Sequence, residues 1–307
     1  MQALVVVNPN ATTMRRRTGD VLLAALSARA DVTIATTTHR EHAVELGAQA
    51  SRERVEAVIA YGGDGTVNEV VNGLLADGPG PHVPVLGVIP GGSANVFARN
   101  LGLPNDPLEA TARLLRALAS PTRRRTVGLG RAGERWFTFN AGLGLDAETV
   151  HAVEQARHRG KRATTGLYLR SAVRSYLHAD RRHPPIHGVL PGGEQLPELF
   201  LALVTNSSPW TYLGPIGVRA APRSSFDAGL DLVATSTLSP PVLLKHVAEI
   251  LGTRQGARGP DVVHRHDLPW LHLQAVRPVA LQVDGDYLGT VTDLRCQAVP
   301  DALRVLV

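Results

Sequence analysis

The stretch of this 307-residue chain best suited to chemistry on a phosphate is Gly62-Gly63-Asp64-Gly65-Thr66. Its glycines let the backbone approach a ligand closely and turn N–H groups toward it, and the helical pattern that follows adds a partial positive charge. A lone carboxylate at Asp64 would repel a phosphate unless a cation such as Mg²⁺ lay between them. The loop therefore predicts a phosphate-binding turn with Asp64 as a metal-linked or proton-accepting carboxylate. A tight turn in which Asp64 only caps the helix is the alternative.

A second glycine loop runs from Pro90 to Asn95, after the next apolar run, and opens another helical pattern. Gly92 and Ser93 lie inside it. Because ligands of parallel sheets bind beyond the carboxyl ends of the strands, two such loops at one edge could hold one polyphosphate from two sides. By itself this loop is equally consistent with a plain helix cap, and its pairing with the first loop is what favours a ligand site.

The charged and sulfur-containing residues exclude several classes of site. Of the 32 lysines and arginines only Lys161 and Lys245 are lysines, and neither has the glycine spacing of a Walker A loop, so phosphate contacts are expected from arginine or backbone. The net charge of +5 comes with short basic runs and no interleaved aromatic residues, which argues against nucleic-acid binding. The single cysteine, Cys296, excludes an intramolecular disulfide, and histidines such as His264 and His266 lack a partner at zinc-ligand spacing.

The first third of the chain alternates strand and helix patterns with short turns. Apolar runs predict strands over residues 4–7, 32–36, 55–60 and 84–89, and helical patterns cover 13–30, 41–52, 67–75, 94–101 and a stretch ending at 114–119. This alternation predicts an α/β domain with a parallel sheet and helices on both faces.

After Pro121 the pattern changes to short strands separated by glycine and proline. We expect strands at 126–129, 136–143, 199–205, 216–220, 230–234, 271–273 and 279–283, with helical inserts over 147–177 and 241–252. Several short strands with few helices predict a mostly β, sandwich-like second domain.

Together these motifs resemble the diacylglycerol kinase catalytic-domain family, which includes bacterial lipid kinases and sphingosine kinases and is more remotely related to NAD kinases. The resemblance rests on Val7-Asn8-Pro9, Thr36, GGDGTVNEV from residue 62, PGGSANVFARNLGL from residue 90, FNAGLGLD from residue 139, residues 212–231, and Asp284-Gly285-Asp286. It implies an ATP-binding α/β domain at residues 1–122, a β-rich lipid-substrate domain at 123–290, and a segment at 291–307 that returns to the first domain. ATP and the lipid would meet between the domains.

In that family a hydroxyl of a membrane lipid attacks the γ-phosphate of ATP, so the resemblance implies ATP and Mg²⁺ as cofactors. It assigns a Mg²⁺ network to Asp64 and Asp146 and the general base to the Asp284-Gly285-Asp286 motif, at Asp286, with Asp64 as the alternative base. Such a carboxylate would take the hydroxyl proton. The nucleotide-binding residues that it implies are Asn8, Pro9, Thr36, Gly62, Gly63, Asp64, Gly65, Thr66, Val67, Asn68, Glu69, Gly92, Ser93 and Asn95.

Three positions depart from the family pattern. Val96 stands where an acid of the Mg²⁺ network is common, Ala228 interrupts an Asp-Asp-Gly metal site, and Asp286 replaces a glutamate and so shortens the base. A displacement of about 1 Å can cost about a hundredfold in rate. These departures motivate one alternative, a nucleotide- or lipid-binding protein that has lost catalysis. The other alternative is an NAD kinase, which shares the GGDGT loop.

Nothing in the sequence predicts a signal peptide or a membrane-spanning segment, so we expect a cytoplasmic protein that meets the inner membrane surface peripherally. Basic runs at 157–162 and 181–183 could rest on anionic lipid headgroups, and an ordinary solvated face is the alternative. The expected partners are a lipid substrate presented by a membrane and an anionic membrane surface, not nucleic acid, and a homodimer stays open.

Overall fold

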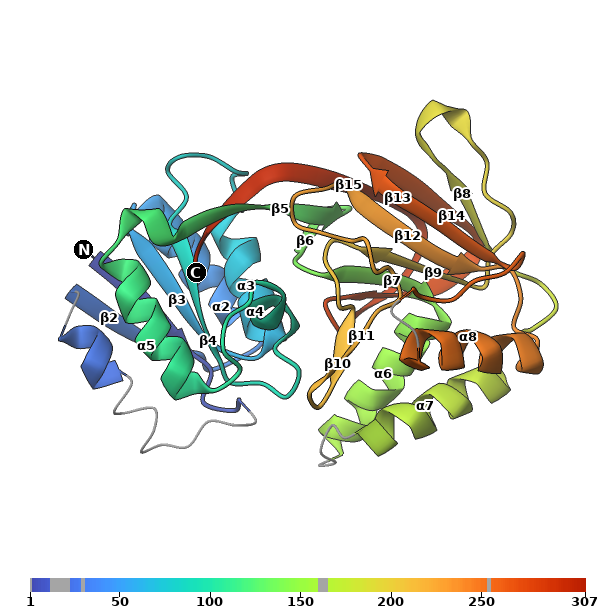
Figure 1. Ribbon diagram of the computed structural model, residues 1–307, viewed down its shortest axis with the longest axis horizontal. Helices are drawn as coiled ribbons and strands as arrows, with labels where there is room; N and C mark the ends of the chain where they lie inside the picture. Colours follow the sequence, from blue (N-terminus) through green and yellow to red (C-terminus); the bar gives the residue numbers. More distant parts are fainter. Residues whose placement is uncertain (1, 12–22, 29–30, 160–164, 253–254) are drawn as a thin grey trace. The chain divides into compact units, whose positions relative to one another are not determined.

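The computed structural model describes residues 2–11, 23–28, 31–159, 165–252 and 255–307, which fall into two compact units (Figure 1). Unit 1 comprises Met1–Leu129 together with Pro300–Val307, and unit 2 comprises Gly130–Val299. The chain leaves unit 1 within strand β5 (Arg124–Ala132) and returns to it within β15 (Asp286–Leu306). We expected these two crossings after residues 122 and 290, so both lie later in the chain than expected.

Unit 1 is built on a parallel sheet with the strand order β2-β1-β3-β4. The end of β15 adds a parallel strand beside β4, with Val305 opposite Leu86. Every residue of β3 and β4 is buried, as expected of strands covered on both faces, and the predicted α/β fold is confirmed. The strands are β1 (Gln2–Val7), β2 (Asp31–Thr36), β3 (Ala57–Gly62) and β4 (Val85–Pro90).

The helices of unit 1 connect these strands and pack closely. A Cβ atom on Gly47 would lie 2.7 Å from the carbonyl oxygen of Val70, so the helices that carry them approach backbone to backbone. The carboxylate of Asp106 accepts the backbone N–H groups of Leu108 and Glu109 and so caps the last helix. The helices after β2 are α2 (His42–Arg52), α3 (Asp64–Leu74), α4 (Val96–Asn100), α5 (Pro107–Leu118) and the short η1 (Pro121–Arg123).

One helix expected in unit 1 lies mostly outside the described residues, and another begins earlier than expected. The helix expected over residues 13–30 falls mostly outside the described residues. Helix α3 begins at Asp64, three residues before the expected start, because the extended backbone of Gly63 serves as its N-cap. Asp64 is therefore a helical residue of the first turn rather than a loop residue.

Unit 2 is mostly β. Its strands pair antiparallel in the order β13-β12-β9-β7-β14-β15, while β8 pairs with β14 and β5 with β6. Side chains from several strands, including Leu143, Val204, Leu232 and Leu273, form its buried core. The strands are β6 (Arg135–Phe137), β7 (Asn140–Gly144), β8 (Ile186–Val189), β9 (Leu201–Thr205), β10 (Thr211–Leu213), β11 (Ile216–Val218), β12 (Leu230–Thr235), β13 (Val262–Leu268) and β14 (Trp270–Val283).

Two strand predictions in unit 2 are corrected by the structure. The single strand expected over 136–143 is two strands, because the backbone at Thr138 and Phe139 turns its N–H groups to the carboxylate of Asp284. Conversely, the strands expected at 271–273 and 279–283 are both parts of β14. Its pairing with β15 shifts register between Gln274 and Val279, so one strand continues through Pro278, where the sequence had suggested a break.

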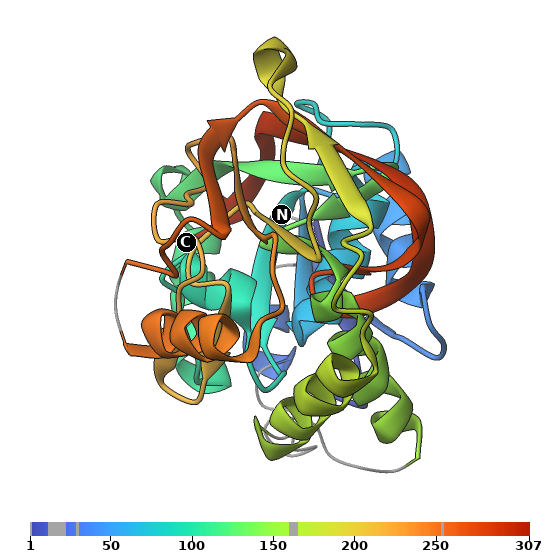
Figure 2. The same cartoon turned by 90° about the vertical axis from the view of Figure 1, so that its right-hand side faces the viewer.

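The helices of unit 2 are α6 (Leu145–His158), α7 (Thr165–His178) and α8 (Pro240–Gly252), and Figure 2 shows them together at one end of this unit. The helical insert expected over 147–177 is thus two helices. A short η2 (Pro191–Gly193) lies in the connection after β8. Among the described residues, no helix combines the length and apolar character needed to cross a bilayer.

Candidate functional site

Three loops meet at the carboxyl edge of the sheet of unit 1. They follow β1, β3 and β4, whose order in the sheet makes them neighbours. The backbone N–H of Gly91 donates to the carbonyl oxygen of Gly62 at 2.8 Å. The side-chain amide of Asn8 donates to the hydroxyl of Thr66 at 2.9 Å. The motifs that the sequence singled out at Asn8, at 62–66 and at 90–95 therefore lie in contact.

The glycines of these loops are required by close approach. A Cβ atom on Gly92 would lie 2.7 Å from the Cα atom of Gly63, and one on Gly62 would lie 2.6 Å from the side chain of Thr66. Real Cβ atoms essentially never come this close to such neighbours. The two glycine loops are thus packed backbone to backbone, which is the arrangement that holding one polyphosphate from two sides requires.

Asp64 connects the first glycine loop to α4, the helix that follows the second glycine loop. Its Oδ1 accepts the backbone N–H of Phe97, the second residue of α4, at 3.2 Å. Its own helix α3 has Gly63 at the N-cap and no side-chain cap hydrogen bond. The alternative in which Asp64 merely caps the helix that follows it is therefore wrong, since this carboxylate lies at the start of the neighbouring helix.

Asn95 shapes the second loop from within. It adopts a left-handed backbone with φ of 50°, and its side chain is buried. The side-chain oxygen accepts the N–H of Gly92 at 2.8 Å, and the side-chain nitrogen donates to the Gly92 carbonyl at 2.9 Å and to Asn105 at 2.8 Å. Asn95 thus fixes the backbone beside the exposed Ser93, while its own polar atoms are engaged inside the loop.

The structure places the remaining expected nucleotide residues unevenly. The side chains of Val67 and Asn68 are buried inside unit 1. Glu69 accepts the backbone N–H of Glu41 at 3.1 Å and so ties α3 to the start of α2. Pro9 and Thr36 are exposed where β1 and β2 end. Gly63, Asp64 and Gly65 are half-buried, so the start of α3 is the part of this motif nearest the surface.

In unit 2 the Asp284-Gly285-Asp286 motif is a two-residue hairpin between β14 and β15. Both turn residues have positive φ, 49° at Asp284 and 83° at Gly285, and Val283 pairs with Asp286 across the turn. Asp-Gly is the preferred sequence for such a turn, because both central residues must adopt a left-handed backbone. The motif is therefore explained first by the geometry of its hairpin, which fixes Asp286 as the first residue of β15.

The carboxylate of Asp284 is fully engaged. It is 4% exposed and accepts four hydrogen bonds, from the backbone N–H groups of Thr138, Phe139 and Asn140 and from the Thr138 hydroxyl, at 2.7–3.0 Å. A carboxylate offers about four lone-pair sites. Asp284 therefore holds the segment between β6 and β7, and this geometry gives it a positioning role within the motif.

Gln282 connects that hairpin to Asp146. Its side-chain nitrogen donates to Asn140 at 2.6 Å and to the Asp146 carboxylate at 2.8 Å, and its oxygen accepts the N–H of Gly285 at 2.9 Å. Gln282 is 1% exposed. Our sequence interpretation missed it, although a glutamine inside the apolar run of β14 is a signal, because a buried amide must find partners.

Asp146 is the second residue of α6 and packs against a glycine. A Cβ atom on Gly142 would collide with the Asp146 carboxylate and would lie 2.6 Å from the Gln282 nitrogen. Burial raises the pKa of Asp146 to about 6, against the hydrogen bond from Gln282, which lowers it. A carboxyl group with such a raised pKa gains most from a nearby cation, because a positive charge favours its ionised form.

The two histidines that we considered and rejected as zinc ligands from the sequence, His264 and His266, make hydrogen bonds within unit 2. His264 hydrogen-bonds the Ala257 carbonyl oxygen at 2.6 Å, and His266 hydrogen-bonds the Asp231 carboxylate at 2.7 Å. In the part of the chain that the structure describes, three metal-capable side chains also gather on the surface, at His39, His42 and Glu45. The rings of His39 and His42 stack on each other, with their centroids 4.6 Å apart.

Comparison with known proteins shows which family this chain resembles. The model of the diacylglycerol kinase catalytic domain matches residues 2–126. A probable lipid kinase YegS-like of Chromohalobacter salexigens is 31% identical over 248 residues, which cover 79% of this chain and 73% of that relative. A diacylglycerol kinase of Bacillus subtilis is 33% identical over 155 residues, 50% of this chain and 48% of the relative.

Solved structures share the fold along the whole chain. The crystal structure of a putative diacylglycerol kinase from Bacillus anthracis superimposes with a TM-score of 0.78 at 22% identity, and the match covers 99% of this chain and 96% of that one. A second structure described as a diacylglycerol kinase from the same organism gives a TM-score of 0.77 at 23% identity, with the same coverage. These similarities establish the two-part fold independently of the sequence motifs.

Proposed function

This chain belongs to the diacylglycerol kinase catalytic-domain family, a family of lipid kinases, and on that basis we propose that it transfers the γ-phosphate of ATP to a hydroxyl group of a lipid, with Mg²⁺. The observation that carries the proposal is the backbone contact between the two glycine loops, with Asp64 at the start of the helix after the second loop. A polyphosphate needs closely spaced N–H donors, and phosphoryl transfer needs carboxylates beside them.

Nucleotide binding in this proposal depends on the backbone of three loops. The contacts of Gly62 and Gly63 with Gly91 and Gly92 leave no room for side chains between the loops. Helices α3 and α4 begin directly at these loops and add their N-terminal partial charge. Asn95 fixes the loop that carries Ser93, which we propose as a direct contact of the nucleotide.

The carboxylates present suit Mg²⁺ chemically. This ion prefers oxygen ligands and is usually bound by one or two carboxylates while it keeps several waters. Asp64 and Asp146 would hold it, and the ion would supply neutralisation of the charge on the transferred phosphoryl group. Burial raises the pKa of Asp146, and this supports the assignment because a cation beside a desolvated carboxylate favours its ionised form.

We assign the proton-accepting role to Asp286. In the proposed step the lipid hydroxyl oxygen forms a bond to the γ-phosphorus, the bond from that phosphorus to the bridging oxygen of ADP breaks, and the hydroxyl proton passes to the Asp286 carboxylate. Asp284 does not take this role in the proposal, because four donors already occupy its carboxylate. Tyr287 follows Asp286, and its ring lies 3.9 Å from that of His151, which holds this end of β15 against α6.

The proposal includes a reversible contact with an anionic membrane on its cytoplasmic side, since a lipid acceptor is presented by a bilayer. Exposed basic side chains at Arg157, Arg159, Arg181, Arg182 and His183 support it. Lys161 and Arg162, which end the basic run at 157–162, lie outside the described residues.

The test offers the purified protein ATP and MgCl₂ with diacylglycerol, a sphingoid base or NAD, and measures ADP release and label transfer. We expect transfer to a lipid and none to NAD. Asp64→Asn should lower turnover about a hundredfold or more, because a charge-stabilising group is lost. Asp106→Asn, the matched control in the same unit, keeps an N-cap residue and should retain full turnover.

Turnover with NAD alone would contradict the proposal in favour of an NAD kinase. Binding of ATP without transfer to any of the acceptors would favour a protein that has lost catalysis. Full turnover by Asp64→Asn would remove the proposed metal site.

A further inference from the structure

Helix α7 exposes apolar side chains and buries small polar ones. Leu169, Val173 and Leu177 follow one another at intervals of four residues, with exposed fractions of 66%, 50% and 65%. Ser171 and Ser175, on the other side of the helix, are buried. A helix that served only the core of its own domain would place these residue types the other way round. The apolar column of α7 therefore faces away from the core of unit 2.

Helix α8 repeats this arrangement. Leu244, Val247 and Leu251 share one face and are 70%, 47% and 51% exposed. Among the described side chains of this helix, the buried one is His246. Exposed leucines occur singly on most proteins, but two helices that each present an apolar column indicate a surface meant for an apolar environment.

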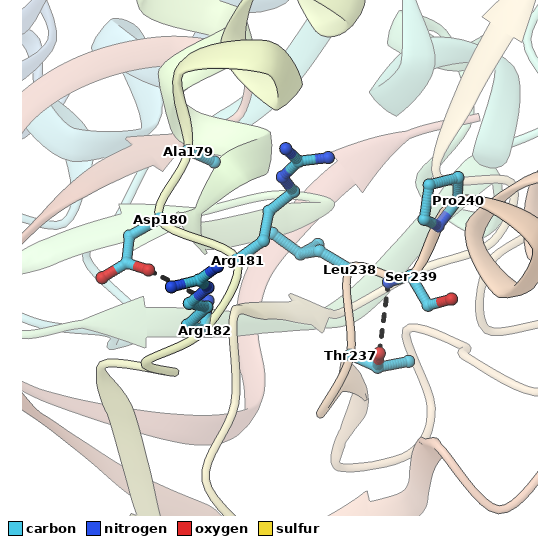
Figure 3. A pocket seen from close by; sticks show the side chains of 8 residues that line it. All are labelled: Ala179, Asp180, Arg181, Arg182, Thr237, Leu238, Ser239 and Pro240. Atoms are coloured by element: carbon cyan, nitrogen blue, oxygen red, sulfur yellow. Dashed lines mark hydrogen bonds between the residues drawn. The ribbon is translucent and has the colours of Figure 1, made fainter.

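The two helices lie at the same end of unit 2 in Figures 1 and 2. The hydroxyl of Tyr176, in α7, donates to the carbonyl oxygen of Leu238, just before α8, at 3.0 Å. Where α7 ends and α8 begins, a cavity of about 420 Å³ lies between residues 179–182 and 237–240. Figure 3 shows the side chains of Arg181 and Arg182 at this cavity, so basic groups lie where the end of α7 and the start of α8 come together.

A column of basic residues adjoins the apolar column of α7. Arg170, Arg174 and His178 repeat at the same interval of four residues, each one position after an apolar residue, and all are exposed. Apolar and arginine columns side by side on an exposed face are typical of helices that lie in the interface of an anionic membrane. A symmetric contact between two copies would bring two copies of the same arginine-bearing patch together, and these like charges would repel.

We propose that α7 and α8 form the docking surface of this protein for a bilayer of anionic phospholipid. Leu169, Val173 and Leu177 of α7 and Leu244, Val247 and Leu251 of α8 enter the boundary between headgroups and acyl chains. Arg170, Arg174 and Arg181 contact headgroup phosphates. The choice of a bilayer as partner rests on the proposed lipid kinase function, whereas the surface itself is defined by exposure and charge.

The apolar contribution is tested by vesicle flotation with phosphatidylcholine vesicles that do or do not contain phosphatidylglycerol. The variants are Leu169→Ser/Leu177→Ser and Leu244→Ser/Leu251→Ser, and each should weaken binding about tenfold or more, because buried apolar area is lost. The matched control is Leu108→Ser/Val276→Ser. These two side chains are 52% and 71% exposed and belong to neither α7 nor α8, so this variant should bind like the wild type.

The electrostatic contribution is tested by Arg170→Gln/Arg174→Gln. We expect about fivefold weaker binding for each arginine at low salt, and a smaller dependence of binding on salt than in the wild type. The control Arg52→Gln/Arg116→Gln removes two exposed arginines from the last turns of α2 and α5, and it should leave binding unchanged.

Absence of wild-type binding to phosphatidylglycerol vesicles would overturn the proposal, as would equal losses in the variants and their controls. Light scattering supplies another decisive outcome: a wild-type dimer that the serine variants dissociate would make the surface a contact between copies. Failure of the proposed function looks different, because vesicle binding through this surface would then persist without turnover on any lipid. Turnover on a short-chain, monomeric lipid should survive in both leucine variants, which separates docking from chemistry.

Discussion

Each unit carries its own set of candidate site residues, and the two sets are built by opposite means. In unit 1 the glycine loops touch through backbone atoms, and the residues that matter are those with no side chain. In unit 2 Asp284, Gln282, Asn140 and Asp146 are held by side-chain hydrogen bonds, and the first three of these residues are buried. The glycine loops of unit 1 should therefore lose their structure when a side-chain atom is added. The residues of unit 2 should lose theirs when a hydrogen-bond donor or acceptor is removed.

The largest effect that this difference predicts is a contrast between neighbouring aspartates. Asp284→Ala leaves several buried donors without their acceptor, so we expect a loss of about 3–5 kcal/mol in the free energy of unfolding. Asp286→Asn should leave that free energy within about 0.5 kcal/mol of the wild-type value and lower turnover about 10²–10⁴-fold, because the proton acceptor is gone. Urea unfolding and a kinase assay on both variants measure the contrast.

The assignment would be reversed if Asp284→Ala kept its stability and lost turnover while Asp286→Asn remained active. Asp284→Asn is a useful third variant, because the smaller change retains one acceptor oxygen. It should lie between the wild type and Asp284→Ala in stability.

For unit 1 the corresponding change adds one methyl group. Gly92→Ala would place a Cβ atom 2.7 Å from the Cα atom of Gly63 and 3.0 Å from the side-chain oxygen of Asn95. We expect a loss of about 1–3 kcal/mol from overpacking and, because the loops separate, loss of measurable ATP binding by calorimetry. Gly252→Ala is the matched control, because a Cβ atom there meets nothing within 4 Å. Wild-type ATP affinity in Gly92→Ala would mean that the contact between the loops does not position the nucleotide.

The same contrast explains what sequence could predict. The glycine loops were found because each motif is contiguous and follows an apolar strand, so local pattern and topology were enough to bring residues 62–66 and 90–95 to one edge. Asn95 was expected to contact the nucleotide, but its role inside the loop became visible only through its hydrogen bonds to Gly92 and Asn105.

The cluster of unit 2 could not be found in the same way. Its hydrogen bonds join residues 136 to 146 positions apart, such as Gln282 with Asp146 and Asp284 with Thr138. The resemblance pointed to Asp146 and to the Asp-Gly-Asp motif, but no local pattern separates an aspartate that holds a loop from one that takes a proton. The four hydrogen-bond donors around the Asp284 carboxylate show that it holds a loop, and those contacts exist only in the tertiary fold.

Asp146 offers a smaller, pH-dependent test of the residues of unit 2. Its pKa of about 6 in the folded chain lies above its ordinary value of 3.8, so its ionisation costs stability. Below pH 3.8 the group is protonated in both states, between 3.8 and 6 stability falls as pH rises, and above 6 the full cost remains. Without added metal, Asp146→Asn should gain about 2 kcal/mol over the wild type at pH 8, a figure reduced for the partial exposure of the side chain, and almost nothing at pH 4.

Thermal unfolding at the two pH values measures this gain. A variant that is less stable than the wild type at pH 8 would contradict the burial of the charge. Gln155→Glu, an exposed change on the same helix, controls for the general response of α6 to pH.

The smallest expected effect concerns Glu69 of unit 1, whose side chain has two alternative roles. The resemblance assigns this side chain to the nucleotide, whereas the structure uses it to accept the N–H of Glu41 at 3.1 Å. Glu69→Gln keeps an acceptor oxygen, so we expect a loss of about 0.5–1 kcal/mol in stability and a KM for ATP within about threefold of the wild type, equivalent to less than about 1 kcal/mol. If the KM rose more than about tenfold while the unfolding midpoint stayed constant, a side chain of α3 would contact ATP directly. The nucleotide-binding residues of unit 1 would then include a side chain from the second turn of α3, and the contrast between the two units would become smaller.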